Sequence, residues 1–355
     1  MSKIDGDKTM DDLSEDLPED SSLFYSISSY GADYTVDVLI KRIKNGDIFV
    51  PKFQRNYVWN IKQASRFIES LLIGLPVPGI FLSKEPDTQK LLVIDGQQRL
   101  KTLEYFYGGN FVSDKIVFAL SGVQPQFENK TYSELSDEQR RRLDDAVIHA
   151  TIIKQERPES DDSSIYHIFE RLNTGGTKLL PQEIRACIYH GKFNDVLSVF
   201  NDDKKWRELF GKKSIHMRDQ EMILRFFALF YSRKLYKKGM IGFMNNFMKE
   251  NRDLKKISED NLTKLFYSTI NTVYDNLDHT VFKPNKKFIA ALFDAVMIGV
   301  AVNIYNKKLV PFGELMKKYN ALFINSDFQN AITTHTSDQE NVTTRISLAI
   351  KAFSA

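Results

Sequence analysis

The chain has a single cysteine, Cys187, so it can form neither an intrachain disulfide nor a cysteine-based zinc site. Its apolar runs all fall short of the ~20 residues that a membrane span requires. The first residues are acidic, unlike a secretory signal or a transit peptide. We therefore expect a cytoplasmic protein with no membrane partner.

Several common catalytic motifs are also missing. The glycines fit neither a phosphate-binding P-loop nor a dinucleotide fingerprint, and no serine lies in a nucleophile elbow. The six histidines form no local metal-ligand pair, and the surroundings of His335 do not match a His-Asn-His nuclease signature. The remaining candidate chemistry belongs to Arg, Gln, Asn and Asp side chains, which suit the binding and polarisation of phosphates.

Charge is distributed unevenly along the chain. Residues 1–20 contain eight acids and two lysines, although the whole chain has a net charge of +3. We expect residues 1–22 to be disordered, and the rest of the chain is basic. A basic body suits a polyanionic partner, but ordinary surface lysines would give the same balance. The 26 Phe and 15 Tyr residues are enough for a sizeable core.

The periodicity of apolar residues changes near residue 190. Before it, strand and helix signals alternate; after it, helical patterns dominate. The expected class is α+β, with an acidic tail at 1–22, a mixed α/β domain at 23–190 and an all-helical domain at 191–355. In the mixed domain we expect helices at 34–44, 61–73, 97–107, 136–145, 161–172 and 181–189, and strands at 47–50, 79–83, 90–94, 116–120 and 146–154. Helical patterns in the rear cover 192–210, 219–237, 239–250, 260–278, 285–305, 311–319 and 338–353.

The most informative stretch is residues 91–103, LLVIDGQQRLKTL. Four apolar residues predict a buried strand, Asp95-Gly96 a turn, and Gln97 the start of a helix. Such a junction directs backbone N–H groups and the positive end of the helix dipole at one point. Arg99, in the first helical turn, could add a mobile cation there. The pattern predicts an anion site, most simply for phosphate, although an ordinary turn with a solvated arginine fits it as well.

Three further segments carry candidate binding residues. Gln54 and Arg55 lie among aromatic residues in an irregular stretch. The aromatic rings could orient the Arg55 guanidinium, form a stacking surface for a base, or anchor an ordinary loop to the core. Asn173-Thr-Gly-Gly176 separates two expected helices, so it is either a second anion-facing loop or a plain helical turn. The basic stretch Lys204–Lys256 is either a solvated helix face or a nucleic-acid surface.

Taken together, these motifs resemble the N-terminal domain of the GmrSD-type, modification-dependent restriction endonucleases. The resemblance covers residues 34–190 and, more loosely, 218–221 and 343–345. It is carried by four ordered segments, which are PKFQRNYVW at 51–59, DGQQRLKTL at 95–103, FERLNTGG at 169–176 and QEIR at 182–185.

The resemblance implies a ParB/sulfiredoxin-like fold whose Asp-Gly-x-x-Arg element contacts nucleotide or phosphate. It implies Mg²⁺ and a nucleoside triphosphate (NTP) as cofactors. The implied catalytic residues are Asp95, Gln97, Gln98, Arg99 and Arg55. The implied nucleotide-binding residues are Gly96, Gln54, Arg171, Asn173, Gly175 and Gly176.

The function expected from these motifs is an NTP-binding and NTP-hydrolysing, DNA-associated component of a restriction or defence system that senses modified DNA. Two alternatives stay open: a non-enzymatic DNA-binding sensor or regulatory subunit, and a ParB-like nuclease acting with a partner. Family members often carry a His-Asn-His nuclease domain, which this sequence lacks. The expected partners are therefore DNA, an NTP, a separate nuclease subunit and a second copy of the chain.

Overall fold

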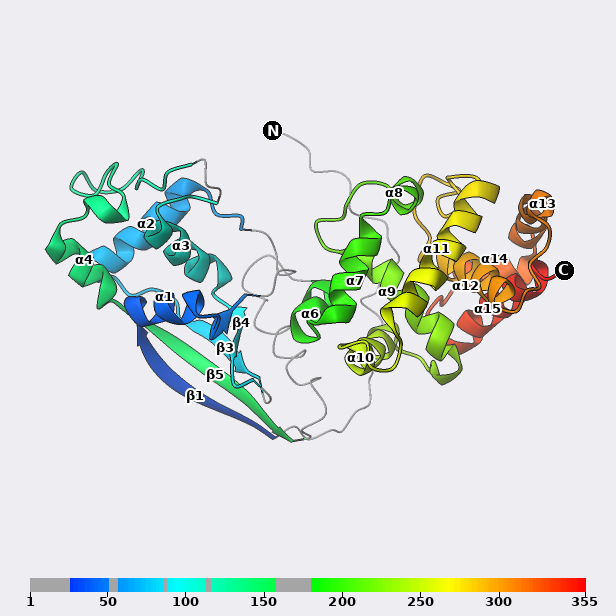
Figure 1. Ribbon diagram of the computed structural model, residues 1–355, viewed down its shortest axis with the longest axis horizontal. Coiled ribbons are helices and arrows are strands. Elements are labelled where there is room, and N and C mark those ends of the chain that lie inside the picture. Colours follow the sequence, from blue (N-terminus) through cyan, green and yellow to red (C-terminus); the bar gives the residue numbers. More distant parts are fainter. Residues whose placement is uncertain (1–25, 51–56, 86–87, 113–115, 158–179) are drawn as a thin grey trace. The chain divides into compact units, whose positions relative to one another are not determined.

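The computed structural model describes residues 26–50, 57–85, 88–112, 116–157 and 180–355, and the chain divides into two compact units between Ile188 and Tyr189 (Figure 1). The first unit contains a five-stranded mixed sheet and the second is helical. The expected α+β class, a mixed domain followed by an all-helical region, is confirmed. Among the described residues, no helix is both long and apolar enough to cross a membrane.

The sheet has the strand order β1-β5-β3-β4-β2. Antiparallel pairs join β1 to β5 and β3 to β4, whereas β5 and β3 run parallel, as do β4 and β2. The strands expected at 79–83 and 90–94 are therefore antiparallel neighbours, β3 and β4. The strands are β1 (Ser26–Thr35), β2 (Ile48–Phe49), β3 (Ile80–Lys84), β4 (Leu91–Asp95) and β5 (Val147–Arg157).

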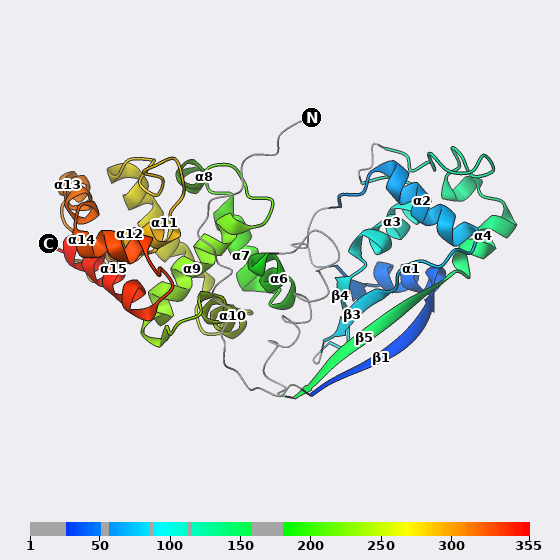
Figure 2. The same ribbon diagram turned by 180° about the vertical axis from the view of Figure 1, so that it is seen from behind.

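Helices of the first unit cover one face of this sheet (Figures 1 and 2). Their apolar faces and alternate residues of β3, β4 and β5 form one hydrophobic core. The four residues Leu91–Ile94 are all buried, which explains why β4 is an unbroken apolar run in the sequence. The helices are α1 (Val36–Lys44), α2 (Ile61–Leu72), α3 (Gln97–Gly108) and α4 (Asp137–Asp144).

One strand of this unit was not predicted, and one predicted strand was wrong. Strand β1 was missed because its sequence, SISSYGADYT, contains strand-depleted Gly and Asp and little apolar surface. Backbone pairing with β5 along the sheet edge stabilises it instead. Residues 116–120 were expected to form a strand, but they contribute a single bridge, between Val117 and Asn110. Phe118 and Leu120 are buried in the core there without joining the sheet.

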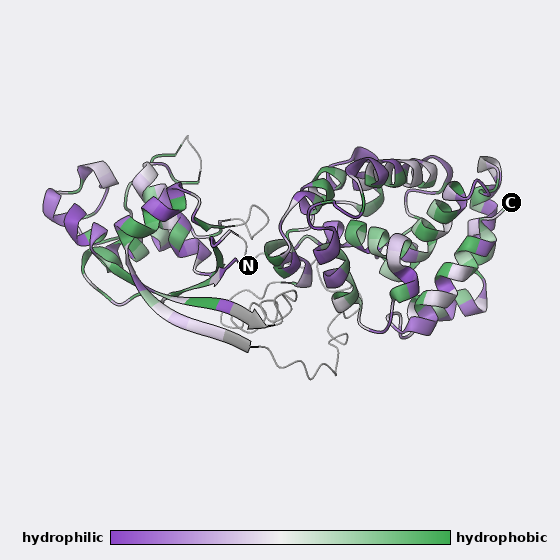
Figure 3. Cartoon of the chain, turned by 60° about the horizontal axis from the view of Figure 1, so that its bottom comes forward, coloured by the Kyte–Doolittle hydropathy of each residue, from purple (hydrophilic) through white to green (hydrophobic). Residues whose placement is uncertain are grey.

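The second unit is organised around α12 (Ala290–Tyr305), a mostly apolar helix that is buried over Ala291–Asn303. Helix α15 packs closely on it at Gly299, where a Cβ atom would lie 2.9 Å from the Ala349 Cβ. Figure 3 shows green apolar and purple polar residues together on most helices of the chain.

The helical elements of this unit are α7 (Lys192–Asn201), α8 (Lys204–Phe210), α9 (Arg218–Ser232), η4 (Arg233–Leu235), α10 (Met240–Asn251), α11 (Glu259–Asn276), α13 (Phe312–Phe323), α14 (Ser326–Thr333) and α15 (Gln339–Ala352), whereas the preceding α6 (Pro181–Ile188) is the last helix of the first unit. Of these, α14 was not predicted. The patterns at 192–210 and 219–237 each contain a break, since α7 and α8 are separate helices and α9 passes into the short η4.

A buried carboxylate joins three helices of this unit. Asp294 on α12 accepts two hydrogen bonds from Arg225 of α9, from Nε and Nη2, each at 2.7 Å. It accepts a third, also at 2.7 Å, from Arg345 of α15. All three side chains are at most 5% exposed. Burial lowers the pKa of Arg345, and Asp294 opposes this shift. Arg345, which belongs to the segment 343–345 of the looser resemblance, is thus part of the packed core.

A second polar cluster fixes the start of α9. Asp219 is 1% exposed, and its Oδ2 accepts hydrogen bonds from Asn201 at 3.0 Å, from Arg207 at 2.8 Å and from the Ser214 backbone at 3.2 Å. Arg207 also lies over the Trp206 ring, 5.8 Å from its centroid. Arg207, which lies within the basic stretch Lys204–Lys256, therefore stabilises a buried cluster and does not lie on a solvated helix face.

Asp294→Asn should destabilise the protein by about 3–5 kcal/mol, because it leaves two buried guanidinium groups without their counter-charge. Urea unfolding followed by circular dichroism measures the change. The matched control is Glu250→Gln, which removes one partner of the exposed Lys256–Glu250 pair and should cost less than about 1 kcal/mol. Equal losses in the two variants would contradict a structural role for the Asp294 cluster.

Candidate nucleotide site

The junction between β4 and α3 is fixed by Gly96. Its φ of +99° lies in the left-handed region, and a Cβ atom would lie 2.4 Å from the Cγ2 of Ile80. Both backbone conformation and space therefore require glycine here. Helix α3 begins at the next residue, and no side chain caps its N-terminus. The expected strand-turn-helix is confirmed. Because Gly96 has no side chain, it provides no oxygen to cap the N–H groups of the first helical turn.

Arg99 is held by three hydrogen bonds. Its Nη1 donates to the carbonyl oxygens of Pro78 and Gly79, each at 2.7 Å, and its Nη2 donates to Asp95 Oδ2 at 2.7 Å. The guanidinium braces the turn against the segment that leads into β3, and the side chain is 12% exposed. This differs from the mobile cation expected from sequence, because the two carbonyls come from a distant part of the chain.

Asp95 keeps an exposed face at the same turn. Its side chain is 43% exposed, and Oδ2 is the oxygen bound to Arg99. Within the described part of the chain, no three His, Cys, Asp or Glu side chains gather as a metal site. A metal ion at this turn would therefore rely on ligands besides Asp95, such as phosphate oxygens and water.

Gln98 links α3 to the segment that follows the Gln54-Arg55 motif. Its Oε1 accepts hydrogen bonds from the backbone N–H groups of Val58, at 2.9 Å, and Trp59, at 3.2 Å. Two motifs about forty positions apart in sequence therefore lie side by side. We call these two hydrogen bonds the Gln98 latch. They occupy the amide oxygen of Gln98, so Gln98 acts as a positioning residue in this structure.

Tyr57 strengthens the same latch. Its hydroxyl lies 2.7 Å from Thr102 Oγ1, which itself donates to the Gln98 carbonyl oxygen at 2.7 Å. The ring packs edge-on against Tyr105 and Phe111, with centroids 5.1 and 5.7 Å away. Burial raises the pKa of Tyr57 to about 12. Thr102 was not among the predicted site residues, although its position one turn after Gln98 on α3 was visible in the sequence.

The remaining predicted site residues separate into two groups. Gln97 lies half-buried in the first turn of α3, next to Gly96, Gln98 and Arg99. The other six lie outside the described residues, and their roles stay predictions: Gln54, Arg55, Arg171, Asn173, Gly175 and Gly176.

The QEIR motif in α6 is buried along its whole length. Glu183 accepts a hydrogen bond from the Leu180 backbone at 2.8 Å, which closes the start of the helix. Arg185 donates to Gln182 within the same helix. Within the described residues, the QEIR motif therefore stabilises the buried helix α6 and its start.

Comparison with known proteins finds a family match for most of the first unit. Residues 36–190 match the family model described as the GmrSD restriction endonuclease, N-terminal domain. The resemblance inferred from the sequence motifs is thereby confirmed. An uncharacterized protein of Methanocaldococcus jannaschii, MJ0686, is 32% identical over 98 residues, an alignment that covers 21% of this chain and 17% of that protein. The chain thus matches a small part of the length of this relative.

Replacing Gln98 by Met should release the Val58 and Trp59 amides, because methionine has a similar shape but no strong acceptor. We expect faster hydrogen exchange at both amides and a stability loss of about 1–2 kcal/mol for two lost hydrogen bonds. Gln98→Glu keeps an acceptor oxygen and is the matched control. Unchanged exchange at Val58 and Trp59 in Gln98→Met would contradict the latch.

Proposed function

We propose that this protein, whose residues 36–190 belong to the GmrSD restriction endonuclease N-terminal domain family, is a DNA-associated component of a restriction or defence system that binds and hydrolyses an NTP. The observation that carries the proposal is the N-terminus of α3 at Gly96. It has no side-chain cap and directly follows a strand. Such a terminus binds phosphate through its N–H groups and its dipole.

Fixed charges surround this terminus. Arg99 is bound in place by Asp95 and two carbonyls, so the turn keeps its shape when phosphate oxygens approach. A preorganised site loses little free energy to rearrangement when charge develops on the transferring phosphoryl group. In this proposal Arg99 acts through the geometry of the turn and through its positive charge.

Mg²⁺ is the proposed metal. It prefers six oxygen ligands and commonly takes most of them from phosphates and water. The exposed Asp95 carboxylate can supply one ligand while its Oδ2 stays on Arg99. The alternative role of this carboxylate is to fix Arg55.

The other predicted residues have roles around the phosphates. Arg55, two positions before Tyr57, would neutralise the charge that builds up during transfer. Gln97 would orient the attacking water, since the oxygen of Gln98 is bound by Val58 and Trp59. The Asn173 loop would contribute further polar contacts to the nucleotide.

DNA is the proposed partner, and in this proposal a separate nuclease subunit cleaves it. NTP hydrolysis would then signal recognition of modified DNA to that subunit.

An NTPase assay with Mg²⁺, with and without DNA, tests the proposal. Arg55→Ala and Asp95→Asn should each lower the hydrolysis rate by about 10²–10³-fold, the effect of losing one charged contact to the transition state. Arg99→Lys should also lower it, because lysine carries all its donors on one nitrogen and lacks the planar fork that reaches the two carbonyls and the carboxylate from separate nitrogens. Arg66→Ala, an exposed arginine on α2, is the matched control and should hydrolyse at the wild-type rate.

Thermal unfolding of each variant separates loss of fold from loss of activity. A wild-type protein that hydrolyses none of the common NTPs, alone or with DNA, would overturn the enzyme proposal. Hydrolysis that is unaffected by Arg55→Ala and Asp95→Asn would instead remove this turn from the active site.

A further inference from the structure

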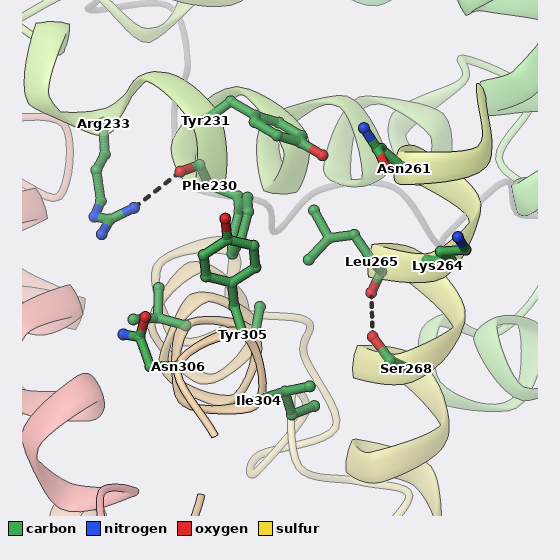
Figure 4. Close-up of a pocket in the computed structure, with 12 residues that line it drawn as sticks. Phe230, Tyr231, Arg233, Asn261, Lys264, Leu265, Ser268, Ile304, Tyr305 and Asn306 are labelled. Atoms are coloured by element: carbon green, nitrogen blue, oxygen red, sulfur yellow. Dashed lines mark hydrogen bonds between the residues drawn. The ribbon is translucent and has the colours of Figure 1, made fainter. Parts of the chain in front are cut away.

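The helical unit contains an open groove of about 700 Å³ with no assigned role. Its walls come from the end of α9 and η4, from α11 and from the end of α12 (Figure 4). The groove falls within the size range of ligand sites. Its most informative lining residues are Phe230, Tyr231, Arg233, Lys264, Tyr305 and Asn306.

Aromatic rings form one wall of the groove. The Phe230 ring contacts those of Tyr231 and Tyr305 edge-on, with centroids 5.1 and 6.1 Å away. Tyr305 is nevertheless 76% exposed and Tyr231 39% exposed. Rings that are supported by the core but keep a face in water provide a stacking surface for planar bases.

The charged lining of the groove is entirely cationic. Arg233 and Lys264 are its two charged residues, and none of the twelve residues that line it is acidic. Burial lowers the pKa of Arg233. Its guanidinium donates to the Phe230 carbonyl oxygen at 2.9 Å, and within the described part of the chain no carboxylate pairs with it. A partly desolvated cation without a counter-charge favours an anionic ligand.

The two cations lie on opposite sides of the aromatic centre. In Figure 4, Arg233 is on one side of the Tyr305 ring and Lys264 on the other, each with an asparagine on its own side, Asn306 or Asn261. In a free NTP all three phosphates lie at one end of the nucleoside, whereas in a nucleic-acid strand an internal nucleotide has a phosphate on each side. The arrangement therefore suits a strand better than a mononucleotide.

We propose that this groove binds single-stranded DNA, with an unpaired base stacked on Tyr305 and Tyr231 and with flanking phosphates on Arg233 and Lys264. Lys234, Lys307 and Lys308 are exposed and adjoin the lining residues in sequence, so they extend the positive surface beyond it. Glu259 and Asp260 precede Lys264 on α11 but do not line the groove. The site goes beyond the proposed function, since it requires no NTP and lies wholly in the helical unit.

Fluorescence anisotropy of a labelled single-stranded DNA oligonucleotide, with the full chain and no nucleotide, tests the groove. Tyr305→Ala should weaken binding by roughly 5- to 150-fold, the measured range for loss of one stacked base. Tyr305→Phe keeps the ring and should bind as the wild type does. Tyr30→Ala, an exposed tyrosine of the first unit, is the matched control and should leave binding unchanged.

A salt series tests the cations. Arg233→Gln and Lys264→Gln should each reduce the slope of log affinity against log salt by about 0.7, the value for one phosphate contact with a single strand. Lys317→Gln, an exposed lysine on α13, should leave the slope unchanged. Thermal unfolding of every variant identifies any that lose the fold.

Three results would overturn the proposal. The first is wild-type binding by Tyr305→Ala. The second is tighter binding of duplex DNA or of RNA than of single-stranded DNA. The third is an NTP that displaces the oligonucleotide and whose own binding falls in Tyr305→Ala, since the groove would then be a mononucleotide site. None of these results bears on NTP hydrolysis at the Gly96 turn, which is measured separately.

Discussion

The close contact between Gly96 and Ile80 determines the geometry of the candidate nucleotide site. Only a residue without a side chain can lie this near β3, and only glycine readily adopts the required left-handed backbone. The contact fixes where β4 ends and α3 begins. Arg99 then reaches the Pro78 and Gly79 carbonyls, and Gln98 reaches the Val58 and Trp59 amides. One steric constraint thus positions both side chains that follow it.

Local features of this site could be predicted from sequence. The buried strand, the glycine turn and the helix start all lie within residues 91–108, where short-range periodicity and turn chemistry decide the structure. The partners of Arg99 could not be predicted in this way. They are backbone carbonyls some twenty positions earlier, and any residue type could have supplied them. A solvated arginine and a bracing arginine have the same sequence pattern.

Long-range pairing explains the other failures. The edge strand β1 depends on β5, more than a hundred residues later, and its own sequence contains Gly31 and Asp33, which are depleted in strands. The helical unit shows the same limit in its charges. Arg225 and Arg345 are indistinguishable in sequence from surface cations, yet a single carboxylate, Asp294, holds both of them in the core. Arg233 of the groove has the same sequence pattern, but within the described part of the chain no carboxylate holds it.

The two proposed sites differ in chemistry, and this difference constrains how they could communicate. The Gly96 turn offers backbone N–H groups and fixed ions, which suit the compact charge of a triphosphate. The groove offers exposed rings and separated cations, which suit an extended strand. If occupation of one site changes the affinity of the other, thermodynamic linkage requires the reverse effect to have the same factor. A DNA strand that strengthens NTP binding must therefore itself bind more tightly to the NTP-bound protein. Each ligand can produce this effect only by binding one conformation better than another.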